Sequence, residues 1–199
     1  MKTRHLFVAS HVHLCAARGF TLIELMVTVL VAAILMATAV PSFREYQRDS
    51  ELTSLSNTLL AAVNSARGEA MKYSAYAIII PSEGADWNTG WRGFVDKNMD
   101  KKYKADDDVL LLEQAALPNY ISIAGTGSAA STSSSPSIIF NASGYAGVGS
   151  TFSNVTINIQ RNDVTGPRYT RRLKISKSGR ARVCRPVDDS DTNCSAGSD

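Results

Sequence analysis

Two arginines near the C-terminal end of the sequence have the type and the spacing to bind a polyanion. In the Gly-Arg-Ala-Arg motif at residues 179–182, the alternation of a β-strand would place both guanidinium groups on one face, roughly 7 Å apart. This spacing is close to that of the phosphates along one strand of DNA. Gly179 permits a tight turn or a close approach beside them. The motif therefore predicts a phosphate-binding site at Arg180 and Arg182.

The motif lies in a segment that is dense in positive charge. Residues 161–185 contain nine basic side chains and a single acidic one, Asp163. Such a segment repels itself, so no role in stability is expected, whereas its cations would displace the counterions that condense on phosphates. The alternative is a solvated strand face, or arginines that bind neighbouring subunits. The candidate DNA-binding residues are Arg180, Arg182, Gly179, Arg171, Arg172, Lys174 and Lys177, and the remaining cations are Arg161, Arg168 and Arg185.

An acidic segment, residues 96–108, resembles the start of a calcium-binding loop. It has the spacing Asp-x-Asn-x-Asp and ends in three consecutive aspartates. However, Lys101 stands where such loops need glycine, and the shorter Asp107 stands at the twelfth position, where glutamate is usual. Nearby lysines would also oppose a cation. A polar hairpin is the preferred interpretation, and neither a metal nor another cofactor is expected.

The sequence offers no constellation for catalysis. Its three histidines, His5, His11 and His13, all fall in an N-terminal leader that we expect to be removed. Without histidine, neither a Ser-His-Asp nor a Cys-His mechanism is available. The rest of the chain has no glycine loop that could bind phosphates and no zinc-type spacing of cysteines. We therefore expect a protein that is not an enzyme.

The N-terminal 40 residues determine the class of protein. Residues 1–19 are basic without any acid, and residues 20–40 are almost entirely apolar, long enough for a helix of roughly 30 Å that spans a bilayer. Three interpretations compete: a secretory signal cleaved after Ala39, a plain membrane anchor, and a leader cleaved between Gly19 and Phe20. The first two leave Glu24 unpaired among apolar residues, at a cost of roughly 2.5–3.5 kcal/mol or more.

Residues 18–24, Arg-Gly-Phe-Thr-Leu-Ile-Glu, resemble the type IV prepilin cleavage motif. The resemblance implies that a prepilin peptidase cuts between Gly19 and Phe20 on the cytoplasmic side and that the amine of Phe20 is then methylated. It also implies that Glu24 meets the N-terminal amine of a neighbouring pilin, which makes a charge in lipid tolerable and sets the axial register of assembly. The mature protein would cross the inner (cytoplasmic) membrane once, with its head in the periplasm.

Removal of the leader would change the charge and the cysteine count. The formal charge of +3 includes Lys2, Arg4 and Arg18, so the mature chain would be close to neutral, and the placement of charge matters more than its sum. Cys15 would also be lost. Cys184 and Cys194 remain, and an even pair in an exported domain predicts a disulfide, with two free thiols as the alternative.

The periodicity of the sequence predicts an α+β protein. Residues 20–41 would form the membrane half of a long helix, and an apolar stripe at spacings of three and four predicts its amphipathic half over residues 42–73. The stripe consists of Leu52, Leu55, Leu59, Ala62, Ala66, Ala70 and Tyr73, with Arg67 among the residues of the opposite, polar face. Residues 74–199 contain short alternating runs typical of an antiparallel β-rich head, and the first run is expected to stop at Pro81.

The order of motifs in the head is similar to that of the GspH/FimT group of minor pilins and pseudopilins. The motifs are Gly-Trp-Arg-Gly-Phe-Val-Asp at residues 90–96, Ile-Ile-Phe at 138–140 ahead of Gly144, and Ser-Gly-Arg-Ala-Arg at 178–182. The resemblance implies the type IV pilin fold, with two antiparallel sheets packed against the long helix. In some FimT-type minor pilins a Gly-Arg-x-Arg motif is linked to DNA binding, which by position points to Arg180 and Arg182.

Three functions follow from this resemblance. The leading hypothesis is a minor type IV pilin that adds a surface for double-stranded DNA, independent of sequence, to a retractable pilus used in natural transformation. The second is a structural minor pilin that initiates or caps the pilus through contacts with other pilins. The third is a pseudopilin of a type II secretion system. The last two would not bind DNA.

Overall fold

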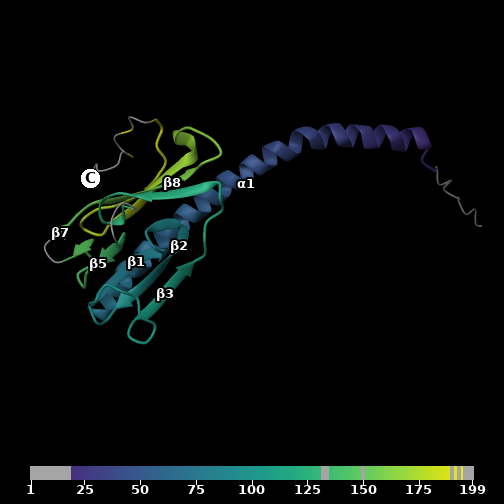
Figure 1. Ribbon diagram of the computed structural model, residues 1–199. Helices are drawn as coiled ribbons and strands as arrows, with labels where there is room; N and C mark the ends of the chain where they lie inside the picture. Colours follow the sequence, from purple (N-terminus) through teal and green to yellow (C-terminus); the bar gives the residue numbers. More distant parts are fainter. Residues whose placement is uncertain (1–18, 131–134, 149–150, 189–190, 192–193, 195–199) are drawn as a thin grey trace, which may run out of the picture. The chain divides into compact units, whose positions relative to one another are not determined.

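The computed structural model describes residues 19–130, 135–148, 151–188, 191 and 194 (Figure 1). The chain divides into two compact units, Met1–Glu45 and Tyr46–Asp199. The predicted leader, including Cys15 and the three histidines, lies outside the described residues except for Gly19.

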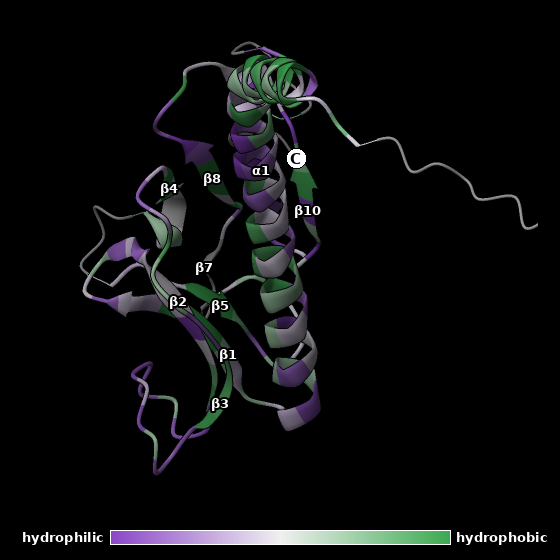
Figure 2. Ribbon diagram, turned by 90° about the vertical axis from the view of Figure 1, so that its right-hand side faces the viewer, coloured by the Kyte–Doolittle hydropathy of each residue, from purple (hydrophilic) through white to green (hydrophobic). Residues whose placement is uncertain are grey.

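The first unit contains the N-terminal part of one long helix, α1 (Leu22–Tyr73). Thr21 caps this helix, because its Oγ1 accepts a hydrogen bond of 3.3 Å from the backbone N–H of Glu24. The apolar residues that follow are exposed and coloured hydrophobic in Figure 2. By length and composition this part of α1 could cross a membrane, and none of its apolar stretch is buried within the protein.

The second unit contains the rest of α1, which is amphipathic as the sequence predicts. Residues at spacings of three and four form its buried face because one side of a helix repeats at that period. They are Leu52, Leu55, Ser56, Leu59, Ala62, Val63, Ala66 and Ala70. Tyr73, assigned to the same stripe from the sequence, is instead 42% exposed at the last helical residue.

Two four-stranded antiparallel sheets and one short ribbon complete the second unit. The first sheet has the strand order β3 (Val109–Gln114), β2 (Asp86–Asp96), β1 (Tyr76–Glu83), β5 (Ile138–Phe140). The second has the order β10 (Ala181–Cys184), β9 (Thr170–Ile175), β8 (Val155–Arg161), β4 (Ile121–Gly125). The ribbon pairs β6 (Gly147–Val148) with β7 (Thr151–Phe152), and short 3-10 helices span Gly127–Ala129 and Pro167–Tyr169.

The core lies between α1 and both sheets. Trp87 and Trp91 of the first sheet and Ile157 of the second are fully buried in one cluster with the buried face of α1. Figure 2 shows α1 alongside these strands. The α+β class and the packing of two antiparallel sheets on one long helix are thereby confirmed.

The prediction that the first strand stops at Pro81 is wrong. Strand β1 continues to Glu83, and Pro81 still lies opposite Trp91 of β2. A proline is tolerated here because β5 pairs with β1 only at residues 77–79. At Pro81 one side of β1 is therefore an edge, where the missing backbone N–H is not needed for the sheet.

Candidate functional site

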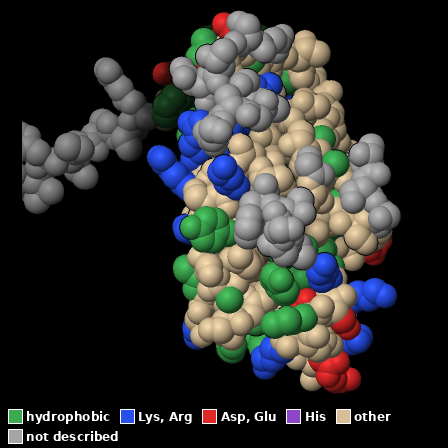
Figure 3. Space-filling model, turned by 90° about the vertical axis from the view of Figure 1, so that its left-hand side faces the viewer, with side chains coloured by type: hydrophobic (Ala, Val, Ile, Leu, Met, Phe, Trp, Pro, Cys, Tyr) green, Lys and Arg blue, Asp and Glu red, His purple; other side chains and the backbone are tan. Residues whose placement is uncertain are grey.

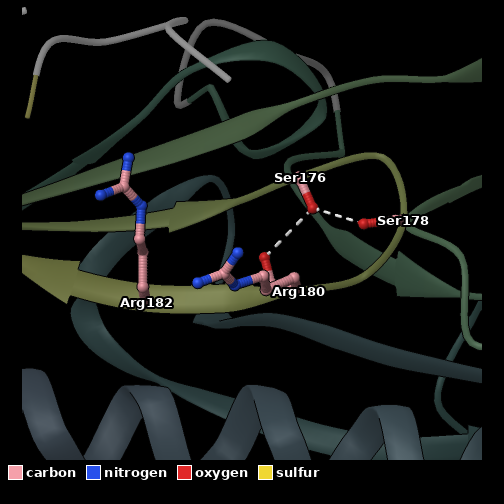
Figure 4. Close-up of a pocket in the computed structure, with 4 residues that line it drawn as sticks. All are labelled: Ser176, Ser178, Arg180 and Arg182. Atoms are coloured by element: carbon pink, nitrogen blue, oxygen red, sulfur yellow. Dashed lines mark hydrogen bonds between the residues drawn. The ribbon is translucent and has the colours of Figure 1, made fainter. Parts of the chain in front are cut away.

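The Gly-Arg-Ala-Arg motif lies on the hairpin that joins β9 to β10, the edge strand of the second sheet. The turn is closed by two backbone hydrogen bonds, from Ser176 N–H to the Arg180 carbonyl at 2.9 Å and from Gly179 N–H to the Ser176 carbonyl at 2.8 Å. Arg180 is exposed, and Arg182, which lies opposite Lys174 on β9, is half-buried. In Figure 4 the side chain of Arg180 extends along the hairpin towards Arg182.

Both arginines line a surface hollow of about 250 Å³ together with Ser176 and Ser178. The two serine hydroxyls lie 2.8 Å apart (Figure 4). Guanidinium groups present a planar fork of N–H donors that suits phosphate oxygens, and hydroxyls can donate to the same oxygens. The hollow therefore combines two positive charges with several hydrogen-bond donors, which is the chemistry that an oxyanion needs.

The structure buries three of the nine cations, contrary to the expectation that this charge has no role in stability. Arg161 forms two hydrogen bonds of 2.9–3.0 Å with Asp163, and its guanidinium lies 5.0 Å from the ring centre of Tyr169. Arg171 is 7% exposed and Lys174 only 2% exposed. Because duplex DNA cannot reach buried side chains, Arg171 and Lys174 are not part of an accessible phosphate-binding surface.

Arg171 connects the second sheet to the helix. Its Nη2 donates to Asp49 Oδ1 at 3.3 Å and to Thr53 Oγ1 at 3.1 Å, both on α1, while its Nη1 donates to backbone carbonyls. Burial lowers the pKa of the Arg171 guanidinium, and the nearby Asp49 carboxylate opposes that shift. The residue thus links β9 to α1 through a buried, hydrogen-bonded charge.

The remaining candidates lie nearer the surface. Arg172 donates to Asn158 Oδ1 at 3.1 Å and to the Cys194 carbonyl at 2.7 Å, so it holds the C-terminal segment against the sheet. Lys177 is exposed in the turn beside Arg180. On the face shown in Figure 3, one group of Lys and Arg side chains lies together in the upper left part, whereas basic and acidic side chains mix below.

Asp163 is the acidic residue that the sequence places within the basic segment. Hydrogen bonds from Arg161, together with one from Arg48 of α1 at 2.5 Å, lower its pKa from 3.8 to about 2. Since the folded pKa lies below the unfolded one, this carboxylate stabilises the fold above about pH 4 and loses that contribution as the pH falls through about 2. The ion pairs also join the loop after β8 to α1.

We expect Asp163→Asn to reduce the dependence of the melting temperature on pH in the acid range. The variant should be less stable than the wild type at pH 6, but its melting temperature should fall less between pH 4 and pH 2, because no carboxylate is protonated at this site. Thermal melts followed by circular dichroism over pH 2–6 measure the effect. Parallel pH profiles for the two proteins would contradict it.

The predicted disulfide is present. Cys184 at the end of β10 is bonded to Cys194, and their Cα atoms are 5.9 Å apart. Cys194 is buried, and its backbone N–H donates to Asp191 Oδ1 at 3.3 Å. The bond therefore ties the C-terminal segment to the strand that carries Arg182.

Loss of this disulfide should cost about 2–3 kcal/mol of unfolding free energy, because it removes the constraint on the unfolded chain. We expect the double variant Cys184→Ser, Cys194→Ser to unfold at lower urea concentration than the oxidised wild type. Wild-type protein kept in reductant is the matched control and should behave like the variant. Equal midpoints for the oxidised wild type and the double variant would refute this expectation.

The acidic segment forms the connection between β2 and β3 and binds its own backbone. Asp96 accepts from the N–H of Lys101 at 2.9 Å, Asp108 accepts from that of Lys104 at 2.8 Å, and the Lys104 ammonium lies 2.5 Å from Asp100. Within the described part of the chain, no group of three or more His, Cys, Asp or Glu side chains is arranged to hold a metal ion.

One residue that contacts the site is not predicted by the sequence. Arg67, assigned to the polar face of the helix, is half-buried and donates to the carbonyls of Gly144 at 2.9 Å and Ser178 at 3.2 Å. No pattern along the chain predicts these contacts, because Gly144 lies 77 positions and Ser178 lies 111 positions from Arg67.

The N-terminal residues of the predicted cleavage motif are exposed: Phe20 is 78% exposed ahead of α1, and Glu24 lies in its first turn.

A long N-terminal helix with an apolar first half, packed through its second half against two antiparallel sheets, defines a type IV pilin-like protein. The family model of the type II transport protein GspH matches residues 55–179, and that of the prokaryotic N-terminal methylation motif matches residues 15–40. The chain belongs to the GspH family and is a minor type IV pilin or pseudopilin. The apolar helix and the methylation motif together indicate membrane anchoring and assembly with other pilins.

Two crystal structures of the type IV minor pilin FimU from Pseudomonas aeruginosa are similar to this chain. They are 20% and 19% identical to it, with TM-scores of 0.50 and 0.51, and the matches cover 72% and 68% of this chain and 98% of each FimU chain. The minor pseudopilin EpsH from the type 2 secretion system of Vibrio cholerae is 13% identical, with a TM-score of 0.49 over 69% of this chain and 99% of its own. At these identities the FimU matches support the fold alone. No curated protein sequence gives a significant match.

Proposed function

We propose that this protein is a minor type IV pilin whose head binds the backbone of double-stranded DNA during DNA uptake. The observation that carries the proposal is the hollow on the β9–β10 hairpin, which is lined by Arg180 and Arg182 together with Ser176 and Ser178. Contacts of this kind to phosphates position a protein on DNA without reading its sequence. Binding is therefore independent of sequence and sensitive to salt.

The burial of other cations narrows the candidate DNA-binding residues to those on and beside the hairpin. Arg161 and Arg171 are engaged with carboxylates of the protein itself, so their charge is largely compensated. On the hairpin Arg180 is exposed and Arg182 is half-buried, and Lys177, close to them in sequence, is also exposed. We therefore expect the duplex to contact this hairpin through a small number of phosphates per subunit.

The N-terminal residues would supply the anchor and the route into the pilus. In this proposal a prepilin peptidase cleaves between Gly19 and Phe20, the amine of Phe20 is methylated, and Glu24 pairs with the amine of an adjacent subunit. Until assembly the protein crosses the inner membrane once, with its head in the periplasm. The retracting pilus, rather than this subunit, moves the bound DNA inward.

The second candidate is a structural subunit of a pilus or of a type II secretion pseudopilus. The match to the type II transport family favours it. In that case the exposed arginines would bind carboxylates of neighbouring subunits, and the head would have no affinity for DNA.

A salt titration of DNA binding separates these two functions. The mature chain in detergent micelles is mixed with two labelled duplexes of unrelated sequence, at salt concentrations from 50 to 200 mM. We expect equal affinities for both duplexes and a linear fall of log affinity with log salt, with a slope of about −0.9 for each phosphate contact. Absence of binding at the lowest salt would favour the structural subunit.

A further inference from the structure

We infer that Arg67 of α1 is a positioning residue of the phosphate-binding hairpin, which it holds in the conformation that brings Arg180 beside Arg182. The expected effect of Arg67 on DNA binding rests on the proposed function, whereas its contacts with the hairpin do not. Arg67 itself is not assigned a contact with DNA. Its guanidinium instead fixes the backbone on which the binding side chains are mounted.

The guanidinium of Arg67 joins two segments that are distant in the sequence. Its Nε donates to the carbonyl of Gly144 at 2.9 Å, and its Nη2 donates to the carbonyl of Ser178 at 3.2 Å. Ser178 lies in the turn between β9 and β10, two residues before Arg180. One side chain of the helix therefore holds the turn and the loop around Gly144 at the same time, using the forked donors that only arginine has.

The backbones of these two segments are packed against each other without space for a side chain. Gly179 has φ of 80° and Gly144 has φ of 77°, both in the left-handed region that favours glycine. A Cβ on Gly179 would overlap the carbonyl oxygen of Gly144 and lie 2.7 Å from Nε of Arg67. A Cβ on Gly144 would lie 2.9 Å from Sδ of Met71. The turn thus rests directly on the loop and on α1.

Two further hydrogen bonds fix the neighbouring residue of the turn. The carbonyl of Lys177 accepts from the N–H of Ala146 at 3.0 Å, and the backbone N–H of Lys177 donates to Asn154 Oδ1 at 2.9 Å. Together with Arg67, these contacts restrain the turn at consecutive residues. A turn restrained in the free protein loses less conformational entropy when it binds a phosphate, so its affinity is higher than that of a free turn.

The test uses Arg67→Met, which keeps an unbranched side chain but removes both hydrogen bonds and the charge. We expect its affinity for a labelled duplex to fall about five- to tenfold, since the turn must then be ordered during binding. The salt slope should stay at the wild-type value, because Arg180 and Arg182 still make their phosphate contacts. A slope reduced by about one unit would mean that Arg67 binds phosphate itself, and wild-type affinity would show that it positions nothing; either result overturns the inference.

Two matched variants separate positioning from charge. Arg67→Lys keeps the charge but replaces the fork by one ammonium, so we expect it to lose affinity as well. Lys72→Met removes an exposed charge from the same helix and should bind like the wild type. If Arg67→Lys binds as tightly as the wild type while Arg67→Met does not, the effect is electrostatic and the inference fails.

Hydrogen exchange of the mature chain in micelles, without DNA, tests the geometry alone. In Arg67→Met and Arg67→Lys the amide of Gly179, which donates to the Ser176 carbonyl at 2.8 Å, should exchange at least tenfold faster than in the wild type. Amides of β8 should keep their protection, which shows that the head is still folded. Unchanged exchange at Gly179 would refute the positioning role. Faster exchange, together with a wild-type protein that does not bind DNA, would refute only the proposed function.

Discussion

Replacing Arg180 and Arg182 together by alanine is expected to weaken the affinity of the head for double-stranded DNA about 100-fold. Each charge-assisted contact to a phosphate is worth about 1.5 kcal/mol or more, so the loss of two removes about a factor of ten each. The slope of log affinity against log salt should become shallower by about two units, one for each lost contact. Both effects should be the same for duplexes of unrelated sequence, since phosphates carry no sequence information.

The fold should survive this double replacement. Arg180 is exposed, Arg182 is half-buried at the edge strand β10, and neither belongs to the apolar core. A double lysine variant keeps the charge but loses the fork that binds two phosphate oxygens, so we expect it to recover part of the affinity. The melting temperatures of both variants should stay near that of the wild type.

The matched control removes two other exposed charges from the same unit. Lys101 and Lys102 lie in the connection between β2 and β3, and their replacement by alanine changes the net charge by the same amount. This control should bind DNA nearly as the wild type does. If the double arginine variant folds and keeps the wild-type affinity and salt slope, these arginines are not the site. Arg168, Lys177 and Arg185, which are also exposed, would be the next to test.

Replacing Glu24 by alanine is expected to reduce incorporation into fibres at least tenfold without affecting cleavage. Glu24 is exposed in the first turn of α1, and the proposal pairs it with the N-terminal amine of an adjacent subunit. A charge placed in lipid is costly unless it is paired, so under this proposal the loss of the carboxylate would leave the partner's amine unpaired and would remove the register that the pair provides. Sheared fibres and membranes are compared by immunoblot for the fraction of the protein in each.

N-terminal sequencing accompanies this experiment as its control. Both the wild type and Glu24→Ala should begin at Phe20, because the residues on either side of the cleaved bond, Arg18 to Thr21, are unchanged. Glu24→Gln, which keeps the shape but not the charge, should be defective as well. Normal incorporation of the alanine variant would contradict the pairing, and a mature protein that began at Val40 would contradict the prepilin leader altogether.

The features that the sequence predicts correctly are those set by neighbouring residues. The period of 3.6 residues along residues 52–70 predicts one buried face of α1, and the alternation of residues 155–159 predicts β8. The predicted disulfide between Cys184 and Cys194 is confirmed. The two cysteines are only ten positions apart, so this pairing could be predicted from the local sequence. The prepilin-type motif at residues 18–24 is likewise a local pattern, and the match to the methylation-motif family agrees with it.

The tertiary structure decides which charged side chains are buried and paired and which are exposed. Arg171 and Arg180 are nine residues apart in the same basic segment, yet Arg171 is buried beside Asp49 of α1 whereas Arg180 is exposed at a hairpin. A linear count of charge cannot separate them, because the carboxylate that compensates Arg171 lies 122 positions away. For the same reason, only the folded chain shows that Arg67 supports the turn at Ser178. Burial and pairing depend on which elements pack together, and that is a property of the whole fold rather than of any segment.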